Sequence, residues 1–129
     1  MPNPTAISFP PVAAVPADAT PVLSAAATAA IDSKTAAPAS GKCWYFGGMI
    51  VTYSVTPAAT SLVEVYVRNA ADSADDYLLF KTWITVGGPA PVYLPVALRA
   101  PADRKLRFAA ALDATAAIAL VPLLWEGLP

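Results

Sequence analysis

The sequence predicts an all-β protein: one small β-sandwich or jelly-roll-like domain, preceded by an extended arm rich in proline and alanine. Two observations support this fold class. The 129 residues include 14 prolines and 6 glycines, and so many chain-breaking residues disfavour long helices. From residue 42 onward, short segments rich in β-branched and aromatic residues alternate with turn residues, at the spacing expected of a sandwich.

The predicted arm covers residues 1–41, and the predicted domain covers residues 42–129. The arm contains seven prolines and three charged residues, and alanine, with 13 residues, is the commonest residue type in it. Prolines favour an extended backbone, although residues 24–31 have the composition of a short helix or an edge strand. A segment with so few large side chains cannot bury itself, so we expect it to lie in a groove of a neighbouring subunit. The residues expected to contact a partner are Phe9, Val12, Val15, Val22, Leu23, Ile31, Arg99 and Arg104.

The first strands of the domain are predicted around a pair of glycines. Residues 43–46 and 49–55 are rich in aromatic and β-branched side chains, which favour strands. Gly47 and Gly48 between them predict a bulge or a sharp bend. A turn is expected at residues 56–60.

Three segments alternate with the period of a half-buried strand. In residues 62–68 one face carries Val63, Val65 and Val67, and the other carries Glu64, Tyr66 and Arg68. In the other two segments the shared apolar faces hold Leu78, Phe80, Thr82 and Ile84, and Leu106, Phe108, Ala110 and Leu112.

Two further strands complete the prediction. After a break at residues 87–91, residues 92–98 form a short strand, in which Pro95 indicates an edge or a bulge. Residues 117–125 form a nearly continuous apolar strand. Six or seven strands are therefore expected after residue 42.

The composition favours contact with other protein chains. Hydrophobic residues make up 57% of the chain and charged residues only 13%, about half the usual charged share. A small domain with so few charges exposes apolar surface. The net charge of −1 provides no field that would attract nucleic acid or an anionic membrane. The chain has no uninterrupted run of about 18 apolar residues and no pattern of a signal peptide, so we expect no membrane partner.

The residue types needed for most catalytic sites are missing or scarce. Histidine is absent, which excludes Ser–His and Cys–His nucleophile arrangements. Glu64 and Glu126 are the only glutamates, and we interpret them as isolated surface acids. Cys43 is the only cysteine, so the chain cannot form an internal disulfide. We expect Cys43 to be a packed, unreactive thiol in a reducing cytoplasm. The sequence therefore predicts a protein that is not an enzyme and that uses no cofactor.

Asp72, Asp75 and Asp76 form the strongest metal candidate. Calcium requires several oxygen ligands that converge from a flexible loop. The spacing of these residues lacks the alternating ligands and the central glycine of an EF-hand. Acidic residues are also typical of turns between strands, and we expect no metal site.

The one concentration of positive charge comprises Arg99, Arg104, Lys105 and Arg107. A nucleic-acid site would need more positive charge and aromatic side chains between the basic ones. We interpret these residues as a solvated strand edge, with docking on an acidic protein surface as the alternative.

The layout of the chain resembles that of the head decoration, or cement, proteins of tailed bacteriophages. The resemblance covers the whole chain: a Pro/Ala-rich arm, then a β-sandwich of fewer than a hundred residues with no histidine and one cysteine. It implies a structural protein on the exterior of a virion capsid, made in the host cytoplasm and commonly trimeric. The implied partners are sister subunits and the major capsid protein.

Two other functions stay open. The chain could be another virion component: a neck, tail or fibre adaptor, or a minor capsid protein. It could also be a carbohydrate-binding module, because six aromatic residues could line a sugar-binding face, although such residues more often lie in cores or interfaces. These residues are Trp44, Tyr45, Tyr53, Trp83, Tyr93 and Trp125.

Overall fold

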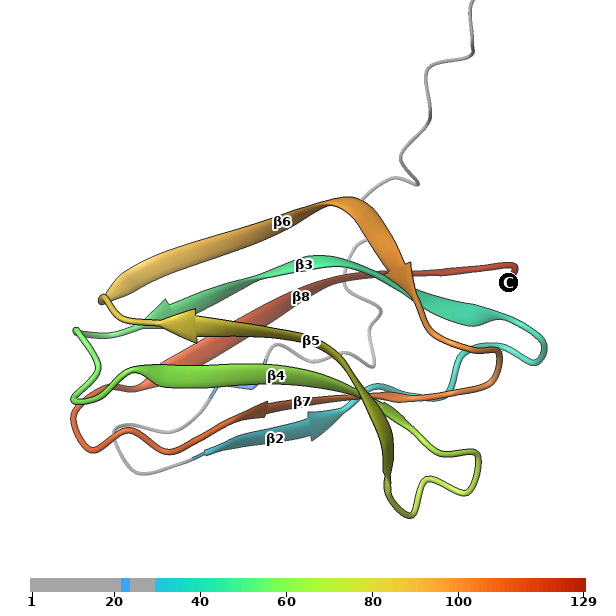
Figure 1. Cartoon of the computed structure of the whole chain (residues 1–129), viewed down its shortest axis with the longest axis horizontal. Helices are drawn as coiled ribbons and strands as arrows, with labels where there is room; N and C mark the ends of the chain where they lie inside the picture. The colour runs from blue at the N-terminus through green and yellow to red at the C-terminus, as the bar shows by residue number, and fades with distance from the viewer. Residues whose placement is uncertain (1–21, 24–29) are drawn as a thin grey trace, which may run out of the picture.

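The computed structural model of the chain describes residues 22–23 and 30–129. This described part contains eight strands and no helix, which confirms the all-β prediction (Figure 1). The six strands that follow residue 42 agree with the number expected. The strands are β1 (Val22–Leu23), β2 (Ile31–Lys34), β3 (Cys43–Tyr53), β4 (Ser61–Arg68), β5 (Asp75–Ile84), β6 (Gly88–Arg99), β7 (Leu106–Ala110) and β8 (Ile118–Gly127).

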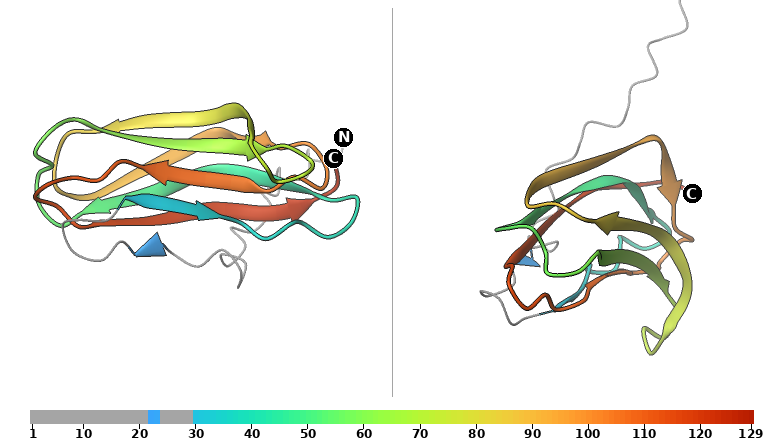
Figure 2. Two further views of the ribbon diagram at one scale, coloured as in Figure 1. Left: turned by 90° about the horizontal axis from the view of Figure 1, so that it is seen from below. Right: turned by 60° about the vertical axis from the view of Figure 1, so that its left-hand side comes forward.

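The strands form two four-stranded antiparallel sheets that lie in two layers (Figure 2). Sheet A has the order β1-β8-β3-β6, and sheet B has the order β2-β7-β4-β5. The first strand pairs with the last, β2 with β7, β3 with β6, and β4 with β5. The first four strands thus pair in order with the last four strands in reverse order. The pairs β1–β8 and β3–β6 lie in sheet A, and the pairs β2–β7 and β4–β5 lie in sheet B. This arrangement is a β-sandwich.

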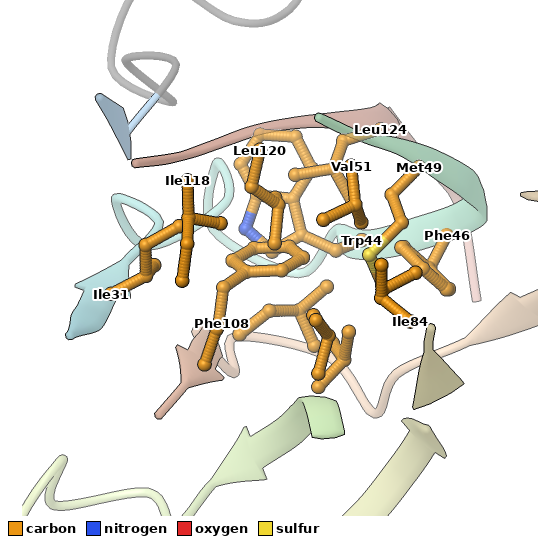
Figure 3. Packing of buried hydrophobic residues seen from close by; sticks show 14 of the residues in the cluster. Ile31, Trp44, Phe46, Met49, Val51, Ile84, Phe108, Ile118, Leu120 and Leu124 are labelled. Carbon is orange, nitrogen blue, oxygen red and sulfur yellow. The ribbon is translucent and has the colours of Figure 1, made fainter. Parts of the chain in front are cut away.

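The core fills the space between the two sheets (Figure 3). Phe46 of sheet A packs against Phe80 and Phe108 of sheet B, with ring centroids 5.4 and 6.2 Å apart. Burial of this apolar surface is the main force that holds the sheets together. The largest fully buried side chains are those of Trp44, Tyr53, Phe46, Ile31, Met49, Leu106, Ile118, Leu120, Leu124, Val51, Val63 and Val65.

The alternation predicted for β4 and for most of β7 is confirmed. The three valines of β4 are buried, whereas Glu64, Tyr66 and Arg68 lie on the outer side. In β7, Leu106 and Ala110 are buried, together with the phenylalanine between them. Leu112, predicted to share their face, is instead exposed, because β7 ends at Ala110 and the chain then leaves the sheet.

A bulge in β5 makes one part of the predicted face wrong. The side chains that do lie on the core side are those of Phe80, Thr82 and Ile84. Beyond them, Leu79 is an extra residue that has no partner in β4. Such an extra residue reverses the alternation of the strand. Leu79 therefore packs against the core, and Leu78 is exposed.

The predicted glycine bulge lies within β3, whose register shifts between Phe46 and Gly48 against β6 and between Phe46 and Met49 against β8. The strand paired with it, β6, is longer than predicted. It begins at Gly88 and includes Pro89 and Pro91, which were expected to break the chain. Prolines are tolerated here because β6 is the edge strand of sheet A, and one side of an edge strand needs no hydrogen-bond donors.

The sandwich includes residues that precede Lys42, where the sequence analysis begins the domain. Ile31–Lys34 forms β2, which pairs with β7 in sheet B. In the connection from β2 to β3, the carbonyl of Ala36 accepts a hydrogen bond of 3.0 Å from the indole N–H of Trp44. The rest of the predicted arm, apart from β1, lies outside the described residues: 1–21 and 24–29.

Candidate functional site

The outer faces of the two sheets differ in charge. The strands of sheet A contain only two charged residues, Arg99 at the end of β6 and Glu126 near the end of β8. The strands of sheet B, which together comprise fewer residues, contain eight. These are Asp32, Lys34, Glu64, Arg68, Asp75, Asp76, Lys81 and Arg107.

The outer side of sheet A forms what we call the uncharged face. Its side chains alternate with those of the core along β3, β6 and β8, and all are half-buried or exposed. They are Tyr45, Ile50, Thr52, Pro89, Pro91, Tyr93, Ala119, Val121, Leu123 and Trp125. Nine of these ten side chains are apolar or aromatic, and a surface on which such side chains gather is typical of a site that contacts another molecule.

Two aromatic side chains lie side by side at one end of this face. Tyr45 of β3 and Trp125 of β8 are opposite each other, and their rings are parallel within 3°, with centroids 5.8 Å apart. The indole ring covers Gly47, where a Cβ atom would lie 2.8 Å from the ring. The phenol ring covers Gly127 in the same way, at 2.7 Å. Each ring therefore lies across the facing strand, and we call the pair the aromatic platform.

Tyr93 extends the uncharged face toward the edge of the sheet. It lies in β6 opposite Gly48, where the two strands approach closely. A Cβ atom on Gly48 would lie 1.9 Å from the carbonyl oxygen of Val92. The pairing of β6 with β3 is interrupted beyond this point and resumes where Leu98 is opposite Phe46, and the side chain of Tyr93 is 66% exposed.

Sheet B carries an ion-pair network on its outer side, with Asp72 at its centre. The Asp72 carboxylate lies 2.8 Å from Nε of Arg68 and 3.0 Å from Nζ of both Lys34 and Lys105. The Arg68 guanidinium, followed by the two ammonium groups, holds the pKa of Asp72 well below its usual range. Asp72 is thus ionised and fully engaged within the protein.

The other two members of the acidic cluster, Asp75 and Asp76 at the start of β5, are paired in the same network. Arg107 bridges Asp32 at 2.8 Å and Asp75 at 2.7 Å, and Arg104 contacts Asp76 at 3.2 Å. The acidic cluster and most of the basic cluster of the sequence are therefore two halves of one network. Among the described residues, no group of three or more His, Cys, Asp or Glu side chains is arranged to hold a metal ion.

The structure separates the domain residues that were predicted to contact a partner. Arg99 is exposed at the rim of the uncharged face, opposite Tyr45. Arg104 lies instead in the charged network of the other sheet. Ile31 is a core residue of its own domain, only 1% exposed, because β2 is paired with β7.

The remaining predicted contacts belong to the arm. Val22 and Leu23 form β1, at the edge of sheet A that is nearest to β8. Phe9, Val12 and Val15 lie outside the described residues. The arm thus enters the domain at the rim of the uncharged face.

The other singled-out side chains have local structural roles. Trp44 and Tyr53 are buried in the core, whereas Trp83 is 57% exposed on sheet B. The Cys43 thiol is buried, as predicted, and donates to the Gly127 carbonyl at 3.5 Å. The two glutamates also have partners: Glu64 accepts a hydrogen bond from Tyr66, and Glu126 accepts one from a backbone N–H.

The uncharged face is the feature that the sequence analysis missed. Its signal is present in the sequence, because the segments that form β3, β6 and β8 are almost free of charged residues. The alternation within each strand does not reveal it, since both faces of these strands are apolar.

Comparison of the chain with known protein families, characterised proteins and solved structures found no match. Among the described residues, no helix is long and apolar enough to cross a membrane. A function for this chain must therefore be inferred from its own strands and surfaces.

Proposed function

We propose that this chain is a non-enzymatic structural protein of a virion, which decorates and stabilises the outside of a capsid as a homo-oligomer. The observation that carries the proposal is the winding of the chain, in which β1 pairs with β8, β2 with β7, β3 with β6 and β4 with β5. We take this winding to be a jelly roll, an architecture common in viral capsid domains and also present in lectins and cupins. Because one fold serves several functions, the surfaces must distinguish among them.

The uncharged face supports an assembly role. Apolar surface that is covered by a partner contributes roughly 25 cal/mol for each Å² removed from water. The charged network keeps much of the outer side of sheet B polar, and the exposed apolar side chains of this sheet, those of Tyr77, Leu78 and Trp83, lie on β5. Sheet A has no comparable network. This asymmetry is what a subunit that attaches by one face requires.

The proposed assembly is a trimer that sits on the major capsid protein, with the N-terminal arm on neighbouring subunits. Small domains that exchange arms bury a large area for each chain while every domain stays small. Prolines in the arm reduce the entropy that is lost when it docks, because an extended chain is already partly ordered.

The proposal that the protein is not an enzyme is supported by the carboxylates that are bound to other groups of the domain. Asp72 and Asp75 each bind arginine, and Asp113 accepts hydrogen bonds from backbone N–H groups. A catalytic acid or base must instead be free to exchange its proton with a substrate. The carboxylates thus serve the fold.

Binding to capsids tests this function directly. Heads that lack this protein, from the virus that encodes it, are mixed with the full chain and separated by sedimentation. We expect saturable binding, at a copy number comparable to that of the capsid subunits, and a higher melting temperature of the heads. A copy number typical of one vertex would instead indicate a neck or tail component. Absence of binding would overturn the proposal.

A carbohydrate-binding module is the second candidate, and the aromatic platform favours it. Exposed aromatic rings can stack on the apolar face of a sugar, and Tyr45 and Trp125 offer two parallel rings on one surface. Titration with a panel of glycans, followed by tryptophan fluorescence, tests this function. A saturable change that is lost in Trp125→Phe and kept in Trp83→Phe would support it, and no change with any glycan would exclude it.

A further inference from the structure

We propose that the uncharged face of sheet A is the docking surface for residues 1–16 of a second copy of this chain, so that copies join head to tail. This inference rests on the proposed oligomeric function and deepens it. It names both the segment that each copy donates and the surface that receives it.

The direction of β1 shows where the donated segment begins. Val22 is opposite Leu120, and Leu23 is opposite Ala119. Because the two strands are antiparallel, each step toward the N-terminus advances one residue along β8 toward its C-terminal end. Continued at the same register, the chain would be level with Trp125 at residue 17. We take the sixteen residues before that point as the segment that is available to a neighbouring domain.

The length of this segment favours a neighbouring domain over its own. Extended at about 3.1 Å for each residue, residues 1–16 span about 50 Å. The ten residues of β8 span about 33 Å at about 3.3 Å for each residue. To cover its own face the segment would have to reverse direction, and its prolines favour an extended backbone. These are Pro2, Pro4, Pro10, Pro11 and Pro16.

The chemistry of the segment matches that of the face. Residues 1–16 contain no charged side chain, and their large apolar side chains are those of Ile7, Phe9, Val12 and Val15. Proline-rich segments bind surfaces lined by aromatic side chains, such as the aromatic platform with Tyr93 beside it. A segment with several charges would have to bury most of them unpaired, because the one charged residue beside this face, Arg99, lies at its rim, and burying unpaired charge is costly.

The edge of β6 is a poor alternative docking site. Pro89 and Pro91 occupy alternate positions in the paired part of this strand, so their nitrogen atoms share one direction, and Pro95 lies in residues 94–97, which have no partner in β3. Since they cannot donate hydrogen bonds, they are tolerated only where that direction is the unpaired outer edge. An incoming strand would find few donors there. The face of the sheet is therefore the better site, and a head-to-tail contact of this kind can close into a ring such as a trimer.

Two variants of the full chain test the inference by complementation. The arm variant carries Phe9→Ser, Val12→Ser and Val15→Ser, and the face variant carries Tyr93→Lys. The matched control is Trp83→Lys, a similarly exposed aromatic residue on sheet B. Circular dichroism verifies that each variant keeps the β-sheet spectrum.

Light scattering after size exclusion then gives the mass of each sample over a range of concentrations. We expect both variants to dissociate at concentrations at least about tenfold higher than the wild type, and the control to match the wild type. A mixture of the arm variant and the face variant should form one-to-one pairs, because one intact arm and one intact face remain. Each variant alone should be monomeric at that concentration.

Three results would overturn the inference. If the wild type is oligomeric and both variants keep its mass, the oligomer uses another contact, and the proposed function still stands. If the mixture forms no pairs, the arm does not dock on this face. If Trp125 is oxidised by radicals more slowly in a monomeric wild-type sample than in the arm variant, the segment covers its own domain. Capsid binding, measured separately, decides the proposed function in each case.

Discussion

At the scale of single residues, Gly48 shows how closely the backbone of β3 approaches its neighbour. Its φ is 126°, a conformation that side chains rarely adopt. An added Cβ atom would also lie 1.9 Å from the Val92 carbonyl oxygen. The bulge that turns β6 away from β3 is thus built around a position without a side chain.

We predict that Gly48→Ala costs at least about 3 kcal/mol of unfolding free energy, from backbone strain and overpacking together. Gly41→Ala is the control, because Gly41 also has a positive φ, of 75°, but has open space around it. Strain alone predicts a cost of about 1 kcal/mol there. Urea unfolding measures both values, and equal costs would contradict the role of the close approach.

Asp113 joins two turns at one end of the sandwich. Its carboxylate is buried and accepts hydrogen bonds of 2.9 Å from the backbone N–H groups of Ala58, Thr115 and Ala116. These hydrogen bonds lower the pKa of Asp113. The largest contribution comes from the N–H of Thr115, followed by the Thr115 hydroxyl and the other two N–H groups. The ionised carboxylate therefore stabilises the folded state.

The sign of this shift predicts acid sensitivity. A carboxyl with a lowered folded-state pKa contributes stability above its unfolded pKa of about 3.9, and the contribution is lost as the pH falls through the folded value. We expect the melting temperature of the wild type to fall from about pH 5 downward. Asp113→Asn should melt lower at neutral pH and lose less on acidification. Parallel pH curves for the two proteins would contradict this assignment.

At the scale of elements, the ion-pair network ties the loop between β4 and β5 to β2 and to the start of β7. Asp72 alone contacts three cationic side chains, those of Lys34, Arg68 and Lys105. Solvent-exposed ion pairs of this kind weaken as the ionic strength rises.

We predict that Asp72→Asn lowers the melting temperature at low salt, and that the difference from the wild type shrinks near 1 M salt, where the Debye length is about 3 Å. Asp76→Asn is the control, because Asp76 forms a single ion pair at 3.2 Å and is more exposed. Its effect should be smaller at every salt concentration. A difference for Asp72→Asn that does not depend on salt would show that the network contributes through packing instead.

The prolines of β6 have a testable consequence for solubility. Edge strands with unpaired donors promote association between molecules, and proline removes those donors. We predict that Pro91→Thr with Pro95→Thr increases light scattering at raised protein concentration. Pro101→Thr, an exposed proline between β6 and β7, should leave scattering unchanged. Equal scattering from all three proteins would show that this edge does not control association.

The elements that the sequence predicted best are those with one polar face. In β4, the predicted alternation along residues 62–68 indicates a core side and a water side, and the structure agrees at each of these positions. The bulge at Leu79 could not be predicted, because a residue is extra only when the partner strand has no residue opposite it, and the pairing of β5 with β4 is not visible in the sequence. Pro89 and Pro91 were misleading for a similar reason: proline breaks a central strand but is compatible with an edge, and the strand order decides which applies.

At the scale of the whole molecule, the candidate site depends on pairings between distant segments. Tyr45 and Trp125 are 80 residues apart in sequence and become neighbours only because β3 pairs with β8. The sequence therefore shows that charge is scarce but not that the scarcity is confined to one face. The winding of the strands collects the uncharged segments in sheet A and the charged ones in sheet B.

The central claim is that this chain assembles with copies of itself, and its solution mass tests that claim most directly. Light scattering after size exclusion is measured on the full-length protein at several concentrations. We predict a stable oligomer, with a mass near three times the 13.3 kDa of the chain. A mass of 13.3 kDa at every concentration would contradict self-assembly and would favour a monomeric binding module.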